Sequence, residues 1–299
     1  MAGERLKRER LTPLWFILPS FLLLFAMIIY PLAFSLYYSF QFWNLAVSEE
    51  PRGFVGFQNY INVLTNPYFH KALYVTFRLS MTAVVLELLL GLGIAILLNQ
   101  AIRGISVFRA LLIMPTALAP TIAGLLFRYM YYQGLGMGVL PFFFIVAGIG
   151  TPEQGILGSS STALYGVMAT DVWAWTPFFA LALLAGLQSV PQDQIEAAKV
   201  DGASEIRIFR HITLPNLRKV ASIIFIIFFM QEFNVYDIIW AMTWGGPGNE
   251  TTTVSFLLYW QGLVYYNIGL ASAMTWVIAL TILIFVNVYF TIVFRGVRV

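Results

Sequence analysis

Ionisable side chains inside apolar stretches are the first residues that the sequence singles out. Six of them stand within runs of about 20 apolar residues: Arg78, Glu87, Arg128, Asp171, Glu232 and Asp237. A charged side chain at the centre of a bilayer costs about 2.5–3.5 kcal/mol on insertion scales, so such a group usually faces a cavity or a partner. Arg78 and Arg128 stand near the ends of their stretches, where an arginine can extend its head to the surface.

Two short patterns surround the carboxylates with polar and aromatic side chains. Asp171 and Trp175 share one helical face at i, i+4, and Gln231, Asn234 and Asp237 share another at successive steps of three. Carboxylates and amides hydrogen-bond to hydroxyl groups, and an aromatic ring packs on the apolar face of a pyranose. These five residues therefore predict a path for a sugar. The pattern also fits a polar seam that joins the chain to a second membrane subunit.

The charge of this predicted path favours one class of solute. Asp171, Glu232 and Asp237 would repel a phosphate or a carboxylate in a low dielectric. A neutral sugar is therefore expected rather than an anionic one.

Several other chemistries are excluded by missing residues. The chain has no cysteine, and His70 and His211 stand far apart, so we predict no metal site. It contains no H-E-x-x-H, no G-x-S-x-G and no G-x-x-x-x-G-K-[ST], so neither a membrane enzyme nor an ATPase is expected. A net charge of +3 gives no indication of nucleic-acid binding.

Composition identifies the elements that must position these residues as membrane helices. The chain is 60% hydrophobic and 10% charged, against about 25% charged in soluble domains. Six stretches are long enough to cross a bilayer as helices: about 12–38, 73–98, 105–131, 162–187, 220–243 and 269–294. The shorter stretches 138–149 and 254–266 are typical of interfacial or re-entrant segments. The predicted fold is all-α with six transmembrane helices.

Basic residues fix the predicted orientation. Six spans bring both termini and two internal loops to one side, which carries 13 of the 17 Lys and Arg residues and is therefore predicted to be cytoplasmic. Residues 1–11 form a cytoplasmic segment, and the membrane domain runs over 12–299. The first apolar stretch is longer than a signal-peptide core and no A-x-A site follows it, so we expect it to remain as an anchor.

The cytoplasmic loop 188–219 has an architecture of its own. Pro191 suits the first turn of a helix, and Gly202 offers the left-handed residue that commonly ends one. A second helix is predicted to begin after Ser204 and to stop before Pro215. By residue types alone this loop is a helical hairpin on the surface.

The same loop resembles a known motif. Permease subunits of ATP-binding-cassette importers carry EAA-x3-G-x9-I-x-L-P, which is matched by Glu196, Ala197, Ala198, Gly202, Ile212, Leu214 and Pro215. The stretches LTPLWFILPSFLLLFAMIIYPLAFSLYYSF, FVGFQNYINVL and YDIIWAMTWGGPGNET resemble the carbohydrate-uptake branch of that family. The resemblance covers about residues 11–295.

This resemblance implies a type I importer permease fold and a role in transport rather than catalysis. The motif helix would be a coupling helix that docks on a cytoplasmic ATPase, with Glu196 and Gly202 holding the shape of the hairpin and its partner contact. Ile206 and Phe209 share a face at i, i+3, and from this we infer that they form the apolar plug of the contact. The implied partners are a pair of ATPase subunits that bind ATP and Mg²⁺, a second permease expected to be a different chain, an external sugar-binding protein and the lipid bilayer. The chain itself would hold no cofactor. The implied location is the inner membrane of a prokaryote.

A secondary transporter or channel subunit for a small polar solute is the competing function. It would also carry buried carboxylates, but it has no need for a docking loop of this size. Such proteins often contain two similar halves with paired broken helices, and no such repeat is visible in the sequence.

Overall fold

The computed structural model describes residues 16–100, 104–132, 138–146 and 155–293. Within these ranges the regular elements are helices, apart from an isolated bridge between Gln41 and Phe54. The expected cytoplasmic segment 1–11 and part of the stretch 138–149 lie outside the described residues. So do seven of the 13 basic residues used for orientation: Arg5, Lys7, Arg8, Arg10, Arg103, Arg295 and Arg298. The chain divides into two compact units, residues 1–66 with 258–281 and residues 67–257 with 282–299.

The first unit contains a long exposed helix and the loops that follow it. The helix Phe16–Ser39 ends in α2 (Tyr30–Ser39) and is followed by α3 (Gln58–Thr65). The Nδ2 atom of buried Asn59 donates to the carbonyl oxygens of Ser39 at 2.9 Å and Gln41 at 2.8 Å, which satisfies backbone acceptors at the end of α2. The unit closes with η4 (Trp260–Val264) and the first half of α15 (Ile268–Val293).

The second unit holds the candidate site. Its elements in chain order are α4 (Pro67–Leu98), α5 (Ile105–Ile113), η2 (Met114–Ala117), α6 (Pro120–Met130), α7 (Val139–Val146), α8 (Gly155–Gly158), α9 (Ala163–Gln188), α10 (Gln192–Val200), α11 (Glu205–Ile208), η3 (Phe209–Thr213), α12 (Leu214–Glu232), α13 (Asp237–Met242), most of α14 (Val254–Tyr259) and the second half of α15.

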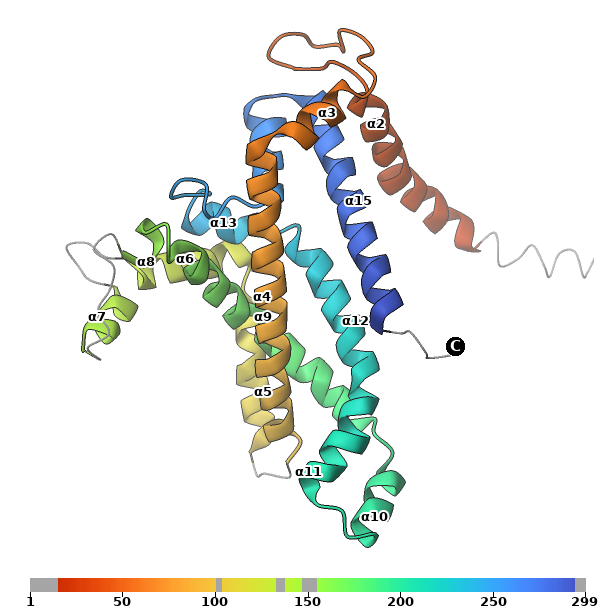
Figure 1. The fold of residues 1–299 in the computed structure, drawn as a ribbon, viewed down its shortest axis with the longest axis vertical. Coiled ribbons are helices and arrows are strands. Elements are labelled where there is room, and N and C mark those ends of the chain that lie inside the picture. Colours follow the sequence, from red (N-terminus) through yellow and green to blue (C-terminus); the bar gives the residue numbers. More distant parts are fainter. Residues whose placement is uncertain (1–15, 101–103, 133–137, 147–154, 294–299) are drawn as a thin grey trace, which may run out of the picture. The chain divides into compact units, whose positions relative to one another are not determined.

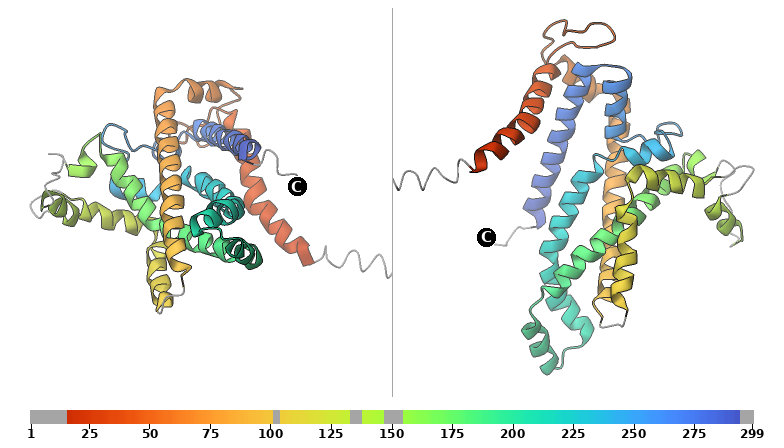
Figure 2. Two further views of the ribbon diagram at one scale, coloured as in Figure 1. Left: turned by 60° about the horizontal axis from the view of Figure 1, so that its bottom comes forward. Right: turned by 180° about the vertical axis from the view of Figure 1, so that it is seen from behind.

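Helices α4, α9 and α12 form the core of this unit and lie against one another (Figure 1, Figure 2). Glycines permit the close approach: a Cβ atom at Gly91 of α4 would lie 2.7 Å from the Cβ of Phe179 on α9. A Cβ atom at Gly186 of α9 would lie 2.8 Å from a methyl of Leu217 on α12. Small residues at such positions let van der Waals contact hold membrane helices together.

The number of apolar helices agrees with a multi-span membrane protein. Among the described residues, five helices are long and apolar enough to cross a bilayer: Phe16–Ser39, Pro67–Leu98, Ala163–Gln188, Glu205–Glu232 and Ile268–Val293. The pair Ile105–Ala117 and Pro120–Met130 passes the same test together and makes a sixth if it counts as one span. The stretch expected to be interfacial near 254–266 forms the short apolar helix Val254–Val264.

The predicted span 105–131 is not one straight helix. Its two halves meet at an angle of 94° around Leu118 and Ala119. Pro115 and Pro120 lack the amide N–H groups of a helical ladder, and proline disfavours helical geometry in the residue before it. The residue types responsible are visible in the sequence, but the size of the bend depends on the packing of α6 against α13 and α9.

The predicted boundaries around Pro215 are also wrong. Helix Glu205–Glu232 runs through this proline, which stands in the first turn of α12. The turn before it, Phe209–Thr213, has π-helical hydrogen bonding, and this wider turn accommodates a proline that would clash with the carbonyl of an α-helix. The helix then ends at Glu232, about ten residues before the predicted end of the span.

Candidate functional site

A cavity of about 150 Å³ lies where α12 ends. Five of the residues that line it were selected from the sequence as a path: Asp171, Trp175, Gln231, Asn234 and Asp237. The structure brings all five together, while their role in transport stays a prediction. Asp171 is fully buried at the inner wall, and Gln231, Asn234 and Asp237 are exposed at the open side.

The cavity is built on a break in the helix. Residues 233–236 separate α12 from α13, so the expected common helical face of Gln231, Asn234 and Asp237 does not exist as such. Two hydroxyl groups satisfy backbone carbonyls at the break: Thr253 Oγ1 donates to Val235 at 2.9 Å and Ser255 Oγ to Phe233 at 3.2 Å. Non-helical backbone is tolerated at membrane depth where protein groups satisfy it or a cavity adjoins it.

Several lining side chains have their own positioning contacts. Thr121 Oγ1 donates to Asp237 Oδ1 at 3.5 Å, and Asn234 Nδ2 donates to the Met230 carbonyl at 3.2 Å. The half-buried Trp175 ring packs edge-on against Phe228, with 5.4 Å between centroids and 70° between planes. The wall therefore places carboxylate and amide groups beside an oriented aromatic ring. The polar groups can hydrogen-bond to the hydroxyl groups of a solute, and the ring can pack on its apolar face.

Three carboxylates from three helices meet behind this wall. Glu87 of α4, Asp171 of α9 and Glu232 of α12 are all fully buried, and carboxylate oxygens from the three lie within 4.8 Å of one another. We call these residues the carboxylate cluster. None of their six oxygens accepts a hydrogen bond from a described residue outside the cluster. Asp171 and Glu232 belong to the cluster and to the cavity at once.

The cluster cannot be fully ionised. Three negative charges at this spacing, away from water, repel one another strongly, and like charges sharing a site disfavour ionisation. We expect protons on the cluster, so that a protonated carboxyl donates to a neighbouring carboxylate. The sequence identified each of the three residues but did not predict that their carboxylates lie together. The available signal was that Asp171 and Glu232 have no cation in their own apolar stretches, and that Arg78, the cation in the stretch of Glu87, stands nine residues away from it.

The two arginines in apolar stretches have protein partners. Arg78 Nη2 donates to the Tyr165 hydroxyl at 2.6 Å, and its guanidinium carbon lies 5.1 Å from the centre of that ring. Arg128 Nη1 donates to the Ala241 carbonyl at 3.3 Å. Because both arginines have protein partners and neither lines the cavity, we assign them no role in binding the solute.

The loop 188–219 forms the predicted helical hairpin at the end of the second unit that is lowest in Figure 1. Gly202 has φ +76°, the left-handed conformation predicted for it. The amide of Ala203 donates to the Ala198 carbonyl at 2.9 Å and that of Gly202 to Lys199 at 3.0 Å, which is the Schellman arrangement of a helix end. Glu196, Ala197 and Ala198 all stand on α10.

Part of the hairpin surface is apolar and has no cover within the described chain. Ile206 is 81% exposed on α11, Phe209 is half-buried and Leu214 is exposed, whereas Ile208 faces inward. Ser204 stands at the amino end of α11 but its side chain makes no capping hydrogen bond. The two helices are joined by an ion pair of 3.1 Å between Lys199 and Glu205. Val200 of α10 is also exposed, at 87%, so both helices of the hairpin carry an exposed apolar side chain.

Comparison with known protein families and sequences agrees with this arrangement. Residues 107–298 match the family model described as binding-protein-dependent transport system inner membrane component. A probable ABC transporter permease protein of Sinorhizobium fredii is 36% identical over all of this chain and 96% of its own length. The trehalose/maltose transport system permease protein MalF of Thermococcus litoralis is 36% identical over 91% of this chain and 90% of its own length.

Solved structures share the fold. A chain of a bacterial ABC transporter that imports the acidic polysaccharide alginate superposes with a TM-score of 0.82, at 18% identity and with 98% of each chain covered. The same kind of transporter in complex with a periplasmic protein that holds an alginate pentasaccharide gives a TM-score of 0.80 at 18% identity, covering 95% of this chain and 96% of that one.

Proposed function

The chain belongs to the binding-protein-dependent transport inner membrane component family, and from this we propose that the cavity at the end of α12 is part of its solute path. The protein is a multi-pass inner-membrane permease of an ABC importer in the carbohydrate branch. It is a non-catalytic component of a system that includes an ATPase and an external binding protein.

The observation that carries the proposal is the composition of the cavity. Asp171 and Trp175 of α9, Gln231 of α12, Asp237 of α13 and Asn234 in the break between α12 and α13 all line one cavity. In secondary transporters, half-helix ends and unwound backbone at a helix break bind the solute, and the break between α12 and α13 offers the same kinds of group to this cavity. If these residues instead form a seam to the second permease, their truncation should break the complex before it changes the response to sugar. Complex yield and ATPase stimulation together distinguish the two roles.

We propose a neutral sugar as the solute. Asp171 and Glu232 at the wall and Asp237 at the opening place acidic groups, and no lysine or arginine, among the residues that line the cavity. A phosphate or carboxylate there would lack a charge partner, and burying an unpaired charge is costly. The Thermococcus relative, a trehalose/maltose permease, is in line with this choice.

The coupling role is proposed for the hairpin of loop 188–219. Its left-handed Gly202 and its exposed Ile206 support docking on an ATPase subunit, with Phe209, Leu214 and Pro215 beside the contact. ATP-driven closure of the ATPase pair would move the hairpin and open the cavity alternately to the two sides. The full proposal has six spans, with the bent pair as one, both termini in the cytoplasm, and a second permease that is a different chain.

The test measures two quantities on the purified complex for Asp171→Ala, Trp175→Ala and Asn234→Ala. These are the yield of detergent-stable complex and the stimulation of ATPase activity by sugar-loaded binding protein. Each truncation removes a hydrogen bond worth about 1 kcal/mol or a stacking face of similar value. Sugar-dependent stimulation should weaken several-fold while the yield stays close to that of the unaltered complex.

A matched control is available on α15. Asn287 Nδ2 donates to the Leu283 carbonyl at 2.8 Å, the same i to i−4 contact that Asn234 makes, but Asn287 does not line the cavity. Asn287→Ala should leave stimulation unchanged. Loss of the complex in the three cavity variants, with normal stimulation of whatever remains assembled, would assign these residues to the seam.

A further inference from the structure

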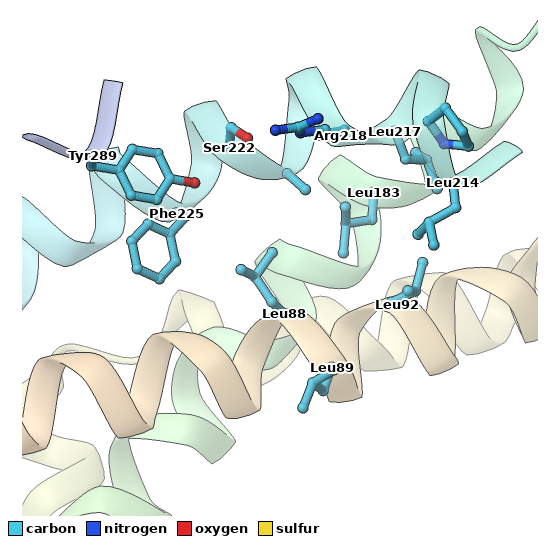
Figure 3. Close-up of a pocket in the computed structure, with 12 residues that line it drawn as sticks. Leu88, Leu89, Leu92, Leu183, Leu214, Leu217, Arg218, Ser222, Phe225 and Tyr289 are labelled. Atoms are coloured by element: carbon cyan, nitrogen blue, oxygen red, sulfur yellow. The ribbon is translucent and has the colours of Figure 1, made fainter. Parts of the chain in front are cut away.

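An apolar groove of about 470 Å³ runs along the opposite end of α12 (Figure 3). Its walls are Leu88 and Leu92 of α4, Leu183 of α9, and Leu214 and Phe225 of α12, with Tyr289 of α15 at one end. Ala221 and Ser222 face it from α12, and their small side chains leave room between the helices. The volume is in the range of sites that hold small molecules.

One cation stands at the rim of this leucine-lined groove. Arg218 lines it and is exposed, and its Nη2 donates to the Val293 carbonyl at 2.6 Å. A guanidinium has five N–H donors, so most of its donors remain for another ligand. The neighbouring Lys219 is also exposed. The groove therefore combines a long apolar interior with a positively charged entrance.

The depth of the groove matches one leaflet of a bilayer. Phe225 lies seven residues beyond Arg218, about 10 Å along the helix, and Leu88 lies ten residues, about 15 Å, from the end of α4 at Leu98. One leaflet of the hydrocarbon layer is about 15 Å thick. An apolar chain that enters beside Arg218 would end inside the same leaflet.

We propose that this groove holds one acyl chain of an anionic phospholipid from the cytoplasmic leaflet, with the lipid phosphate bound by Arg218. Basic pockets between membrane helices on the cytoplasmic side suit anionic headgroups, and arginine binds phosphate through paired donors. The choice of leaflet rests on the proposed orientation of the chain. The site is independent of the sugar path, because Arg218 and the groove leucines do not line the cavity beside Asp171.

The experiment counts lipid on the assembled importer. The complex is purified, stripped of loosely held lipid and titrated with phosphatidylglycerol or with phosphatidylcholine, and bound lipid is counted by native mass spectrometry. A basic residue contributes about 1 kcal/mol to the binding of anionic lipid, which corresponds to about fivefold in affinity. Arg218→Ala should therefore weaken phosphatidylglycerol binding at this site about fivefold and change phosphatidylcholine binding little. Leu88→Trp, which fills the groove, should remove one bound lipid of either kind.

Two controls are matched by residue type. Arg210→Ala removes an exposed arginine of the hairpin, and Leu97→Trp enlarges a 60% exposed leucine of α4, and neither residue lines the groove. Both should leave lipid binding unchanged. If Leu88→Trp does not assemble, Leu89→Phe fills the groove from its exposed edge and takes its place.

Three results would overturn the proposal. The first is equal lipid binding in all variants. The second is that Arg218→Ala weakens the binding of both lipids equally, which would mean that Arg218 does not recognise an anionic headgroup. The third is loss of the second permease from the Leu88→Trp complex with lipid count unchanged, which would assign the groove to a partner helix. Bound lipid is read without transport, so failure here leaves the sugar path untouched, and failure of the path leaves the lipid site untouched.

Discussion

At the residue scale, the carboxylate cluster brings together three ionisable groups that are buried away from water. Glu87, Asp171 and Glu232 are buried from three different helices, and their oxygens meet without a donor from any other described residue. Buried charges without partners are strongly destabilising, whereas protonated carboxyls can hydrogen-bond to one another. We therefore expect shared protons to connect α4, α9 and α12 at the cluster, which adjoins the cavity proposed for the sugar.

This protonated state predicts the effect of substitutions at Glu87. Glu87→Gln keeps the shape and a hydrogen-bond donor, so the complex should retain its yield and its thermal inactivation temperature. Glu87→Ala leaves a void and an unsatisfied neighbour, and should destabilise by about 1–3 kcal/mol. The measurement is the temperature at which half of the purified complex stops eluting as one species. Equal damage from both substitutions would mean that a negative charge at Glu87 is required.

At the scale of elements, the hairpin of loop 188–219 depends on one backbone conformation. Gly202 has φ +76°, which a β-branched residue adopts only with strain of about 1–3 kcal/mol. We therefore expect Gly202→Val, or Glu196→Lys in the motif helix, to lower sugar uptake several-fold while the membrane level of the protein stays unchanged. Uptake of labelled sugar and immunoblots of the membrane fraction measure the two quantities.

Ala203→Val is the control for this prediction. It adds the same side chain one residue later, where the backbone is not left-handed. Uptake should remain normal in this variant. If both Gly202→Val and Glu196→Lys transport normally, the hairpin is a surface feature only.

Local signals could be read from the sequence, whereas contacts between helices could not. The helix end at Gly202 follows from the residue itself, and the spans follow from runs of apolar residues. The bend of 94° after Pro115 and the passage of a helix through Pro215 depend on how neighbouring turns adapt. The meeting of Glu87 with Asp171 and Glu232 depends on the packing of three helices, which no single stretch encodes.

At the scale of the whole molecule, orientation is the property that the other proposals share. The hairpin, the cytoplasmic end of the lipid groove and both termini are proposed to lie on the side where Lys and Arg are concentrated. The loop around Ser48 is proposed to lie outside. Because the chain has no cysteine, single cysteines can report this arrangement directly.

The prediction uses Ser48→Cys and Ser204→Cys in separate proteins. A membrane-impermeant thiol reagent applied to intact cells should label Ser48→Cys and should not label Ser204→Cys. Permeabilised cells serve as the control, in which both cysteines should react. Labelling of Ser204→Cys from outside would reverse the proposed topology.

The continuous helix Glu205–Glu232 gives the two ends of the second unit a mechanical connection. Its 28 residues make a rod about 42 Å long that starts in the hairpin and stops at the cavity. Tilting such a rod by about 5° around its middle displaces each end by about 2 Å, by the same rise per residue. A push on the hairpin would therefore reach Glu232 as rigid leverage, without a relay of side chains. The wide turn at Phe209–Thr213 is the point at which this helix would bend. A stiffer turn would pass more of the displacement of the hairpin on to Glu232.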